Sequence, residues 1–160
     1  MAKFRVGLGY DLHRTVAGRP LVLGNVTIPH EKGLDGHSDA DVVIHALIDA
    51  ISGAAGLPDV GQMFPNTDAR YQGIDSAKLL EGLMGEFAKT GWRMGNVDIV
   101  VIAQKPKLSP YKAAMIGRLA ELLGVRADQV NIKGKTGEGV DALGEERAMA
   151  CHCVVLLEKD

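Results

Sequence analysis

Three candidate metal ligands stand in two separate segments of this chain, so a fold that uses all three must bring these segments together. Asp11 and His13 are two residues apart in the motif GYDLH, directly after residues 4–10, whose alternating pattern predicts a strand. Alternate residues of a strand face the same side, so the two side chains would project together. His45 ends the motif GHSDADVVIH, within a predicted helix, and can add a third ligand. One carboxylate and two imidazoles suit zinc, and three protein ligands leave one coordination position open for a substrate.

The composition is typical of a globular domain without a nucleic-acid or membrane surface. The 160 residues suffice for one domain with a single core, and 46% of them are hydrophobic and 24% charged. The net charge is −2, no long run of Lys and Arg occurs, and aromatic residues are scarce, which argues against binding nucleic acid or an anionic membrane. No apolar stretch approaches the roughly 18 residues of a membrane span, and the first residues enter a strand pattern instead of a signal peptide. We therefore expect a cytoplasmic protein, in which Cys151 and Cys153 are buried, reduced residues on one face of a strand.

The predicted elements form one α/β domain of the α+β kind, residues 1–160, with helices packed on one face of a mixed, mostly antiparallel sheet. A turn at Gly24-Asn25 predicts a hairpin in PLVLGNVTIP. The run NVDIVVIAQ is almost continuously apolar, which indicates an internal strand at 96–104. Two further strands are predicted at 130–134 and 148–157.

The first predicted helix begins beside the histidines of GHSDADVVIH. Ser38 would cap a helix that starts near Asp39, with Asp41 as the second residue of a capping box. Asp41 also lies four residues before His45 on the same helical face, so it could equally support that ligand through a hydrogen bond. His37 directly precedes the helix, where the positive end of the helix dipole favours an anion. Two further helices are predicted, one from Asp75 or Ser76 to Gly91 and one capped by Ser109-Pro110 and ending near Gly124.

Two loops combine glycine or proline with lysine in a way that suits anion binding. In KGKTGEGVDALGEER, residues 133–147, backbone amides with Lys135 and Thr136 could hold a phosphate, and Glu138 could hold a magnesium ion beside it. From the residues alone, a solvated hairpin loop is slightly favoured. The segment AQKPKLSPYK places three lysines before a helix N-terminus, which suits a second anion site or a solvated basic turn. Neither a P-loop nor a dinucleotide-binding glycine motif is present.

Five blocks follow one another along the chain: GYDLH, GHSDADVVIHALIDAISGAAGLPDVG, FPNTD, NVDIVVIAQKPKL and VNIKGKTGEG. In order and spacing, across essentially the whole chain, they resemble the 2-C-methyl-D-erythritol 2,4-cyclodiphosphate synthase family. The resemblance implies conversion of 4-diphosphocytidyl-2-C-methyl-D-erythritol 2-phosphate to the cyclodiphosphate and CMP, in non-mevalonate isoprenoid biosynthesis. It also implies zinc and magnesium (or manganese) as cofactors, and a homotrimer whose sites lie between neighbouring subunits.

The same resemblance implies roles for individual residues. The ions would be bound by Asp11, His13 and His45 (zinc) and by Glu138 (magnesium). His37 and Thr136 would stabilise the transition state. On the methylerythritol and phosphate side, the substrate would contact Asp11, His13, His37, Ser38, Asp59, Gly61, Phe64, Pro65, Asn66, Thr67 and Asp68. On the cytidine diphosphate side, it would contact Ala103, Gln104, Lys105, Pro106, Lys107, Leu108, Ser109, Lys135, Thr136, Gly137 and Glu138.

Several positions depart from the commoner family pattern. Glu145 stands where many members have an arginine at the central cavity of the trimer, which in those members binds an isoprenoid diphosphate. A carboxylate repels such an anion, so we do not expect that ligand here. Gly137 and Gly139 replace bulkier residues, which should loosen the loop around Glu138. Ala142 replaces a larger apolar residue, and Asn66 replaces a frequent aspartate.

Two other classes of protein use the same residues. A zinc-dependent phosphohydrolase would attack a phosphoester with a metal-bound water at the Asp11, His13 and His45 cluster. A non-enzymatic trimeric module would use the histidines only to satisfy the ends of its elements. Metal analysis separates the module from the two enzymes. Release of CMP without free phosphate separates the cyclising enzyme from the phosphohydrolase.

Overall fold

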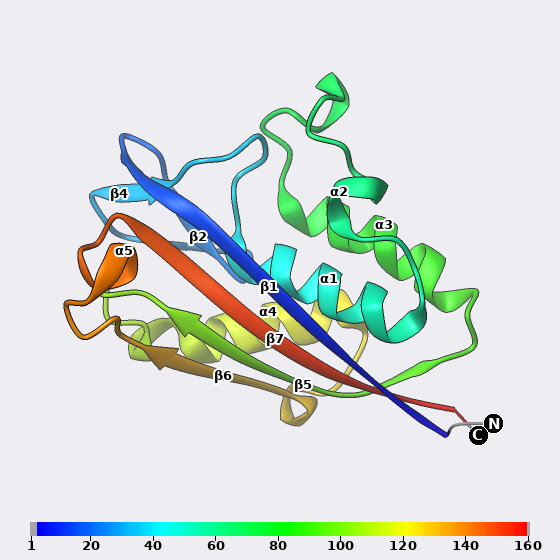
Figure 1. The fold of residues 1–160 in the computed structure, drawn as a ribbon. Coiled ribbons are helices and arrows are strands. Elements are labelled where there is room, and N and C mark those ends of the chain that lie inside the picture. Colours follow the sequence, from blue (N-terminus) through cyan, green and yellow to red (C-terminus); the bar gives the residue numbers. More distant parts are fainter. Residues whose placement is uncertain (1–2, 160) are drawn as a thin grey trace.

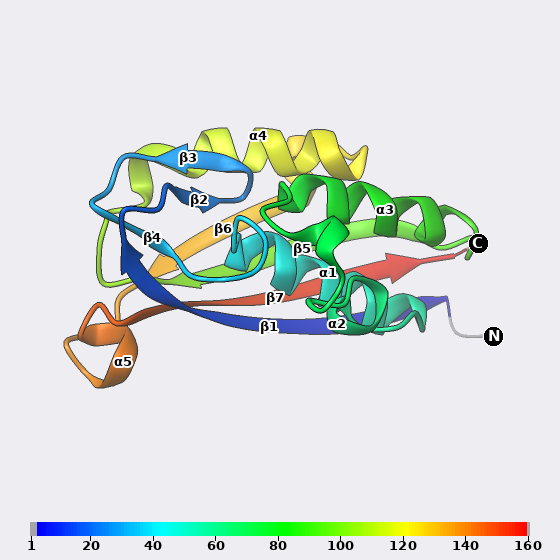
Figure 2. The same cartoon turned by 90° about the horizontal axis from the view of Figure 1, so that it is seen from above.

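A curved five-stranded sheet, covered by helices on one face, forms the framework of the computed structural model, which describes residues 3–159 (Figures 1 and 2). The strands are β1 (Phe4–Ala17), β2 (Leu21–Leu23), β3 (Val26–Ile28), β4 (Lys32–Leu34), β5 (Arg93–Ile102), β6 (Val130–Lys135) and β7 (Ala148–Glu158). The helices are α1 (Val42–Ala55), α2 (Val60–Met63), α3 (Ser76–Ala88), α4 (Lys112–Leu123) and α5 (Asp141–Gly144), with 3-10 turns at Ala69–Tyr71, Ser109–Tyr111 and Ala127–Gln129. The sheet is mixed and its helical cover is one-sided, as the sequence predicts. In the described residues, no helix has both the length and the apolar character needed to cross a membrane.

The long strand β7 is the central strand of the sheet, between β1 and β5. The sheet order is β4-β1-β7-β5-β6, and β2 and β3 form a separate hairpin. The pairs β4–β1, β1–β7 and β7–β5 run antiparallel, whereas β5 and β6 run parallel and are joined through α4. The strands predicted at 96–104, 130–134 and 148–157 are therefore confirmed, and Cys151 and Cys153 are buried, free thiols of β7.

Helix α1 is the central helix and packs against β1, β7 and α3. It is buried along most of its length because nearly all of its residues are apolar. The exceptions with a charged or imidazole side chain are His45 and Asp49, which lie one turn apart and are half-buried. The sheet and α3 thus hold α1 firmly, while the polar side chains of α1 stay at the edge of the core.

Two glycines of β1 let α1 approach the sheet more closely than any other residue would allow. A Cβ added at Gly7 would lie 1.9 Å from the carbonyl oxygen of Ala50, and one added at Gly9 would lie 1.8 Å from that of Ala46. Each two-residue step along the strand therefore matches about one turn of the helix. The next step brings Asp11 level with the first turns of α1, where His45 lies. The glycines of GLGYDL thus serve helix–sheet packing.

Replacing Gly9 with alanine is expected to lower the free energy of unfolding by about 1–3 kcal/mol or more, because the new methyl group meets backbone atoms that cannot rotate away. The matched control is Gly85→Ala on α3, where an added Cβ meets nothing within 4 Å and a small gain in stability is expected. Urea denaturation of both variants measures the effect. Equal stabilities of Gly9→Ala and the parent would contradict this packing.

The predicted cap of the first helix is wrong, because α1 begins at Val42 and its N-cap is Asp41. The Asp41 carboxylate accepts hydrogen bonds from the backbone N–H groups of Val43 and Ile44 and also from those of Gly24 and Asn25. Asp41 is fully buried, and this burial raises its pKa to about 6. Asp41 is therefore a cap that also ties the hairpin turn to the helix, and it does not support the His45 side chain. Its carboxylate also occupies the helix N-terminus that was expected to attract an anion beside His37.

The remaining helix predictions hold in part. Helix α3 begins at Ser76 with Asp75 as its N-cap, as expected. Ser109-Pro110 does not cap α4, because both residues lie inside a 3-10 turn that precedes the helix. The hairpin is confirmed, and both turn residues, Gly24 and Asn25, have positive φ.

Candidate active site

Asp11, His13 and His45 meet at one point beside β1 and α1. The Asp11 Oδ2 atom lies 2.9 Å from His13 Nε2 and 3.1 Å from His45 Nδ1, and the two imidazole nitrogens are 3.1 Å apart. Each of the three residues offers one atom that can bind a metal, and these three atoms all lie within 4.8 Å of one another. Among residues 3–159, this is the group of His, Cys, Asp or Glu side chains that could hold a metal ion. The fold therefore brings together the three predicted metal ligands.

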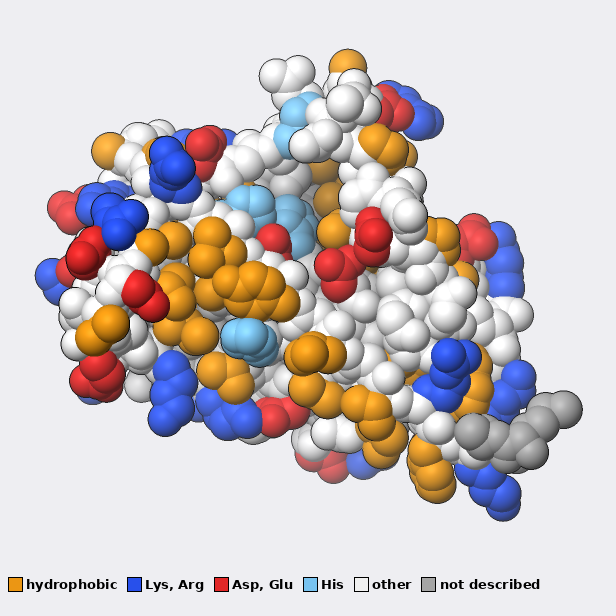
Figure 3. Space-filling model, viewed as in Figure 1, with side chains coloured by type: hydrophobic (Ala, Val, Ile, Leu, Met, Phe, Trp, Pro, Cys, Tyr) orange, Lys and Arg blue, Asp and Glu red, His pale blue; other side chains and the backbone are white. Residues whose placement is uncertain are grey.

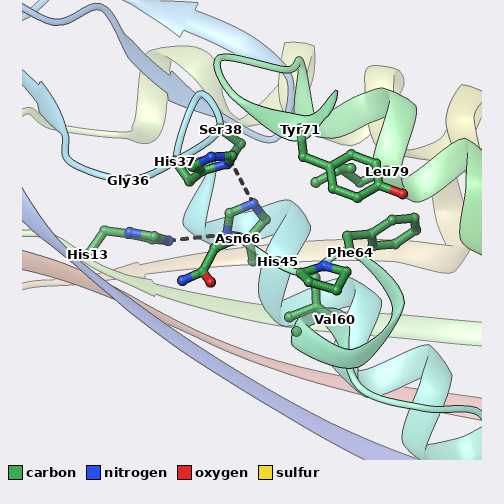
Figure 4. Close-up of a pocket in the computed structure, with 12 residues that line it drawn as sticks. His13, Gly36, His37, Ser38, His45, Val60, Phe64, Asn66, Tyr71 and Leu79 are labelled. Atoms are coloured by element: carbon green, nitrogen blue, oxygen red, sulfur yellow. Dashed lines mark hydrogen bonds between the residues drawn. The ribbon is translucent and has the colours of Figure 1, made fainter. Parts of the chain in front are cut away.

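The outer nitrogens of both imidazoles are held by neighbouring groups. His13 Nδ1 lies 2.7 Å from the backbone carbonyl of Asp35, which can only accept, so Nδ1 carries a hydrogen and Nε2 faces the cluster. Figure 4 shows His45 between His13 and Ser38, with its other nitrogen turned away from the cluster. Ligands of zinc are usually oriented by such outer hydrogen bonds. One carboxylate oxygen and two oriented imidazole nitrogens fit a zinc ion.

The electrostatics of the cluster keep the carboxylate ionised. Burial opposes ionisation of Asp11, but its hydrogen bonds to His13 and His45 outweigh this effect and hold the pKa of Asp11 well below its usual range. Burial also lowers the pKa of His13, but the hydrogen bond and the charge of Asp11 raise it overall. Protonated imidazole beside carboxylate is the arrangement that a divalent cation replaces, with release of the proton.

A cavity of about 380 Å³ opens directly beside the cluster (Figure 4). Its lining residues are His13, Gly36, His37, Ser38, His45, Val60, Gly61, Phe64, Pro65, Asn66, Tyr71 and Leu79. Of the predicted substrate contacts on this side, Asp11, Asp59, Thr67 and Asp68 do not line it. Asp59 caps α2, and Asp68 pairs with Arg70 at 2.6 Å. The sequence did not single out Tyr71 and Leu79, because isolated apolar residues carry no motif.

The His37 turn and the start of α2 are fixed to this cavity by hydrogen bonds. The Arg19 guanidinium donates to the carbonyls of Gly36 and Ser38 at 2.8 and 2.7 Å, and the carbonyl of His37 accepts from the backbone N–H of Gly73. On the opposite wall, the Asp49 carboxylate accepts from the N–H of Val60 at 2.8 Å. These contacts hold the backbone of both walls while leaving the His37 imidazole at the cavity.

A second cavity, of about 470 Å³, lies where the parallel strands β5 and β6 end. Its lining residues are Ala103, Gln104, Lys105, Pro106, Lys107, Leu108, Ser109, Lys112, Gly134, Lys135 and Thr136. Nearly every residue predicted for the cytidine diphosphate side is here. Lys105 pairs with Glu146 at 3.0 Å, so Lys107, Lys112 and Lys135 are the lysines best placed for an anion. The two cavities share no lining residue.

The loop after β6 is tightly closed around its glycines. A Cβ at Gly137 would lie 2.3 Å from the backbone nitrogen of Gly144, so only glycine allows the two ends of the loop to meet. The expected loosening is therefore wrong for Gly137, which permits close packing. Glu138 has a positive φ of 52°, and its carboxylate accepts from the Thr136 hydroxyl at 2.9 Å. The backbone N–H of Gly137 donates to the Gln104 side chain, which links the loop to the second cavity.

Glu145 is not a free carboxylate. Its side chain pairs with Arg147 at 2.7 Å, and both lie beside a third, strongly charged cavity. The negative charge at this position is thus partly balanced within the same subunit.

The chain belongs to the YgbB family, whose model matches residues 4–158. It is 52% identical to the 2-C-methyl-D-erythritol 2,4-cyclodiphosphate synthase of Dechloromonas aromatica, over 98% of this chain and 98% of that protein. The CDP complex of IspF from Plasmodium falciparum has a TM-score of 0.88 and 34% identity, and the match covers 100% of this chain and 99% of that one. The bifunctional IspDF from Campylobacter jejuni has a TM-score of 0.95 and 37% identity; the match covers 99% of this chain, which spans 43% of that longer chain.

Proposed function

We propose that this protein converts 4-diphosphocytidyl-2-C-methyl-D-erythritol 2-phosphate to 2-C-methyl-D-erythritol 2,4-cyclodiphosphate and CMP in non-mevalonate isoprenoid biosynthesis. The observation that carries the proposal is the convergence of Asp11, His13 and His45 beside a cavity that also contains His37 and Ser38. The full-length similarity to a synthase of this name supports it.

The reaction is an intramolecular phosphoryl transfer. An oxygen of the 2-phosphate forms a bond to the β-phosphorus, and the bond from that phosphorus to the oxygen of the α-phosphate breaks, so CMP leaves. No protein nucleophile is needed, and burial raises the pKa of both Cys151 and Cys153, so neither is a reactive thiolate. Catalysis then consists of holding the two ends of one flexible molecule together and neutralising charge on its phosphates.

Each group in the first cavity has a proposed task in this transfer. Asp11, His13 and His45 would hold zinc, which supplies positive charge to a phosphate oxygen when bound. His37 would donate a hydrogen bond to an oxygen on which charge develops, and Ser38 would bind a phosphate. Gly61, Phe64, Pro65 and Asn66 of this cavity would surround the methylerythritol part, together with Asp59, Thr67 and Asp68, which neighbour them in the sequence.

The second cavity would take the nucleotide end of the substrate. Residues 103–109 would enclose the cytidine, with Lys107 and Lys135 near its phosphates. Thr136 would donate to the transferring group, and Glu138 would hold magnesium or manganese, which would supply positive charge to the diphosphate. The Thr136 hydroxyl, which now donates to Glu138, would turn to the substrate.

The products separate this function from a phosphohydrolase. With zinc and magnesium present, the protein should release one CMP for each substrate consumed and no inorganic phosphate, measured by ³¹P NMR. Accumulation of inorganic phosphate, or of a linear methylerythritol diphosphate, would favour attack by water.

An apolar stripe on the open face of the sheet supports a homotrimer (Figure 3). Large apolar side chains at alternate positions of β1, and one on β7, point away from the helices. They are Phe4, Val6, Leu8, Tyr10, Leu12 and Val154, and each is between 41% and 68% exposed. Exposed apolar side chains gathered along one face in this way are typical of a protein–protein interface. Assembly across this face is proposed to bring the first cavity of one subunit to the second cavity of its neighbour. The proposed location of the trimer is the cytoplasm.

Light scattering is expected to give three times the 17.0 kDa of one chain. Leu8→Asp should reduce this mass and the activity together, because it buries a charge in the proposed interface. A monomer with full activity would contradict the assembly.

Mixing two inactive variants tests whether each site is shared between subunits. His13→Ala damages the first cavity and Thr136→Ala the second, so co-expression should restore activity at about a quarter of the sites in randomly mixed trimers. No recovery in verified mixed trimers would place each whole site within one subunit.

Glu138→Gln is expected to raise the magnesium concentration needed for half-maximal rate, with partial recovery at high magnesium, because the amide loses the charge that attracts the ion. Glu158→Gln, a carboxylate at the end of β7, serves as the matched control. An unchanged magnesium titration for Glu138→Gln would reject the metal role of this residue.

A further inference from the structure

A series of hydrogen bonds starts from the His45 nitrogen that faces away from Asp11 and His13. The Nε2 atom of His45 is 3.0 Å from the hydroxyl of Ser76. That hydroxyl lies 2.5 Å from the Asp39 carboxylate, which also accepts from the backbone N–H of Ser76 at 3.1 Å. Ser76 is 0% exposed, so these contacts are shielded from water. None of the tasks proposed above uses Asp39 or Ser76.

The chemistry of these groups decides which atom donates in each hydrogen bond. An ionised carboxylate can only accept, so the Ser76 hydroxyl must donate its hydrogen to Asp39. The Ser76 oxygen is then left with lone pairs, and it accepts from His45 Nε2. Nε2 therefore carries a hydrogen. Nδ1 is the nitrogen that faces Asp11 and His13, so it is the one whose lone pair a metal ion at the cluster would take.

Ser38 is a weaker partner for the same nitrogen. Its hydroxyl oxygen lies 3.2 Å from His45 Nε2 and 3.4 Å from the Ser76 oxygen. It already accepts from the backbone N–H of Ala40. In the contacts described, no carboxylate accepts the hydrogen of the Ser38 hydroxyl. Asp39 and Ser76 therefore decide that His45 Nε2 is a donor.

The three groups come from three segments that pack around the metal cluster. Ser76 is the first residue of α3, His45 is on α1, and Asp39 lies in the loop before α1. Asp39 is fixed there, since its own N–H donates to the carbonyl of Ile74 and its carboxylate accepts from the N–H of Asp41. The start of α3 is thereby tied to a metal ligand of α1.

We propose that Asp39 and Ser76 are positioning residues for zinc binding, which fix the His45 ring in the tautomer whose Nδ1 faces the metal. This proposal rests on the zinc site of the proposed function and extends it to residues that do not touch the metal. Outer partners of this kind typically change metal affinity by about 10–100-fold.

Zinc affinity, measured by competition with a chromophoric chelator, tests the proposal without recourse to catalysis. Ser76→Ala should weaken zinc binding by about 10–100-fold. Asp39→Asn should also weaken it, because an amide cannot accept from both the hydroxyl and the N–H of Ser76 as the carboxylate does. The matched control is Ser52→Ala, at a buried serine of α1 whose hydroxyl contacts Met63, which should bind zinc as the parent does.

The hydrogen on His45 Nε2 gives a second readout that a merely structural role would not move. In ¹H–¹⁵N spectra of the zinc-loaded parent, this hydrogen should be protected from exchange with water, because it is donated to the Ser76 hydroxyl, which is 0% exposed. In zinc-loaded Ser76→Ala it should exchange faster. If the variants fail to fold, the parent spectrum still decides, and an Nε2 hydrogen that exchanges as fast as that of free imidazole would overturn the proposal.

The outcomes separate this inference from the function on which it rests. A parent that binds no zinc would reject the metal site and this inference with it. A parent that binds zinc tightly, with Ser76→Ala and Asp39→Asn binding equally tightly, would overturn the positioning role alone.

Discussion

His13→Ala is expected to lose its zinc and its activity while keeping its fold. The substitution removes one of three ligands, and zinc affinity should fall by at least about 100-fold, the upper end of the effect of losing an outer partner. The fold should survive because the His13 side chain lies at the edge of the first cavity and its surroundings are polar. Elemental analysis after gel filtration gives the zinc content, and circular dichroism gives the melting temperature.

His30→Ala is the control for this variant, because it removes an imidazole outside the cluster and should retain zinc and activity. Full zinc occupancy in His13→Ala would reject this residue as a ligand. Loss of zinc with unchanged turnover would reject a role for the metal in the reaction.

His37→Ala is expected to lower turnover by about 100-fold and to leave zinc in place, as for the loss of one positioned hydrogen-bond donor. The backbone of this turn is held by Arg19 and by the N–H of Gly73, so removing the imidazole should leave the turn where it is. Because Asp41 occupies the N-terminus of α1, the donor effect must come from the imidazole itself.

Comparison of kcat with KM checks this role for His37. A higher KM with unchanged kcat would indicate that His37 only binds the ground state, whereas we expect a lower kcat. His37→Gln retains a donor and should recover part of the rate; if it is as slow as His37→Ala with zinc bound, the donor role fails.

Local patterns were sufficient to predict much of the sheet and the candidate metal cluster. The apolar run of β5 and the Gly24-Asn25 turn have short-range causes, so their prediction needed no tertiary knowledge. Asp11 and His13 could be predicted because strand geometry alone puts them on one face.

The start of α1 could not be predicted in this way. Ser38, Asp39 and Asp41 are all acceptable caps by residue type. The choice of Asp41 depends on the N–H groups of Gly24 and Asn25, which come from a hairpin seventeen and sixteen residues earlier in the chain. Tertiary contacts therefore decided between local alternatives of similar quality.

The surroundings of the metal cluster were also beyond local patterns. The close approach permitted by Gly7 and Gly9 places His45 beside Asp11, and a glycine in a strand gives no sign of which helix lies over it. The Asp35 carbonyl and the Ser76 hydroxyl, which hold the outer nitrogens of the two histidines, carry no motif at all.

Turnover in ¹⁸O-labelled water distinguishes intramolecular transfer at this site from attack by water. The cyclodiphosphate and CMP are analysed by mass spectrometry after a single turnover with zinc and magnesium present. We expect that neither product contains ¹⁸O, since the attacking oxygen belongs to the 2-phosphate of the substrate. Incorporation of ¹⁸O into CMP or into a linear methylerythritol phosphate would show that water is the nucleophile, and would contradict the proposed function.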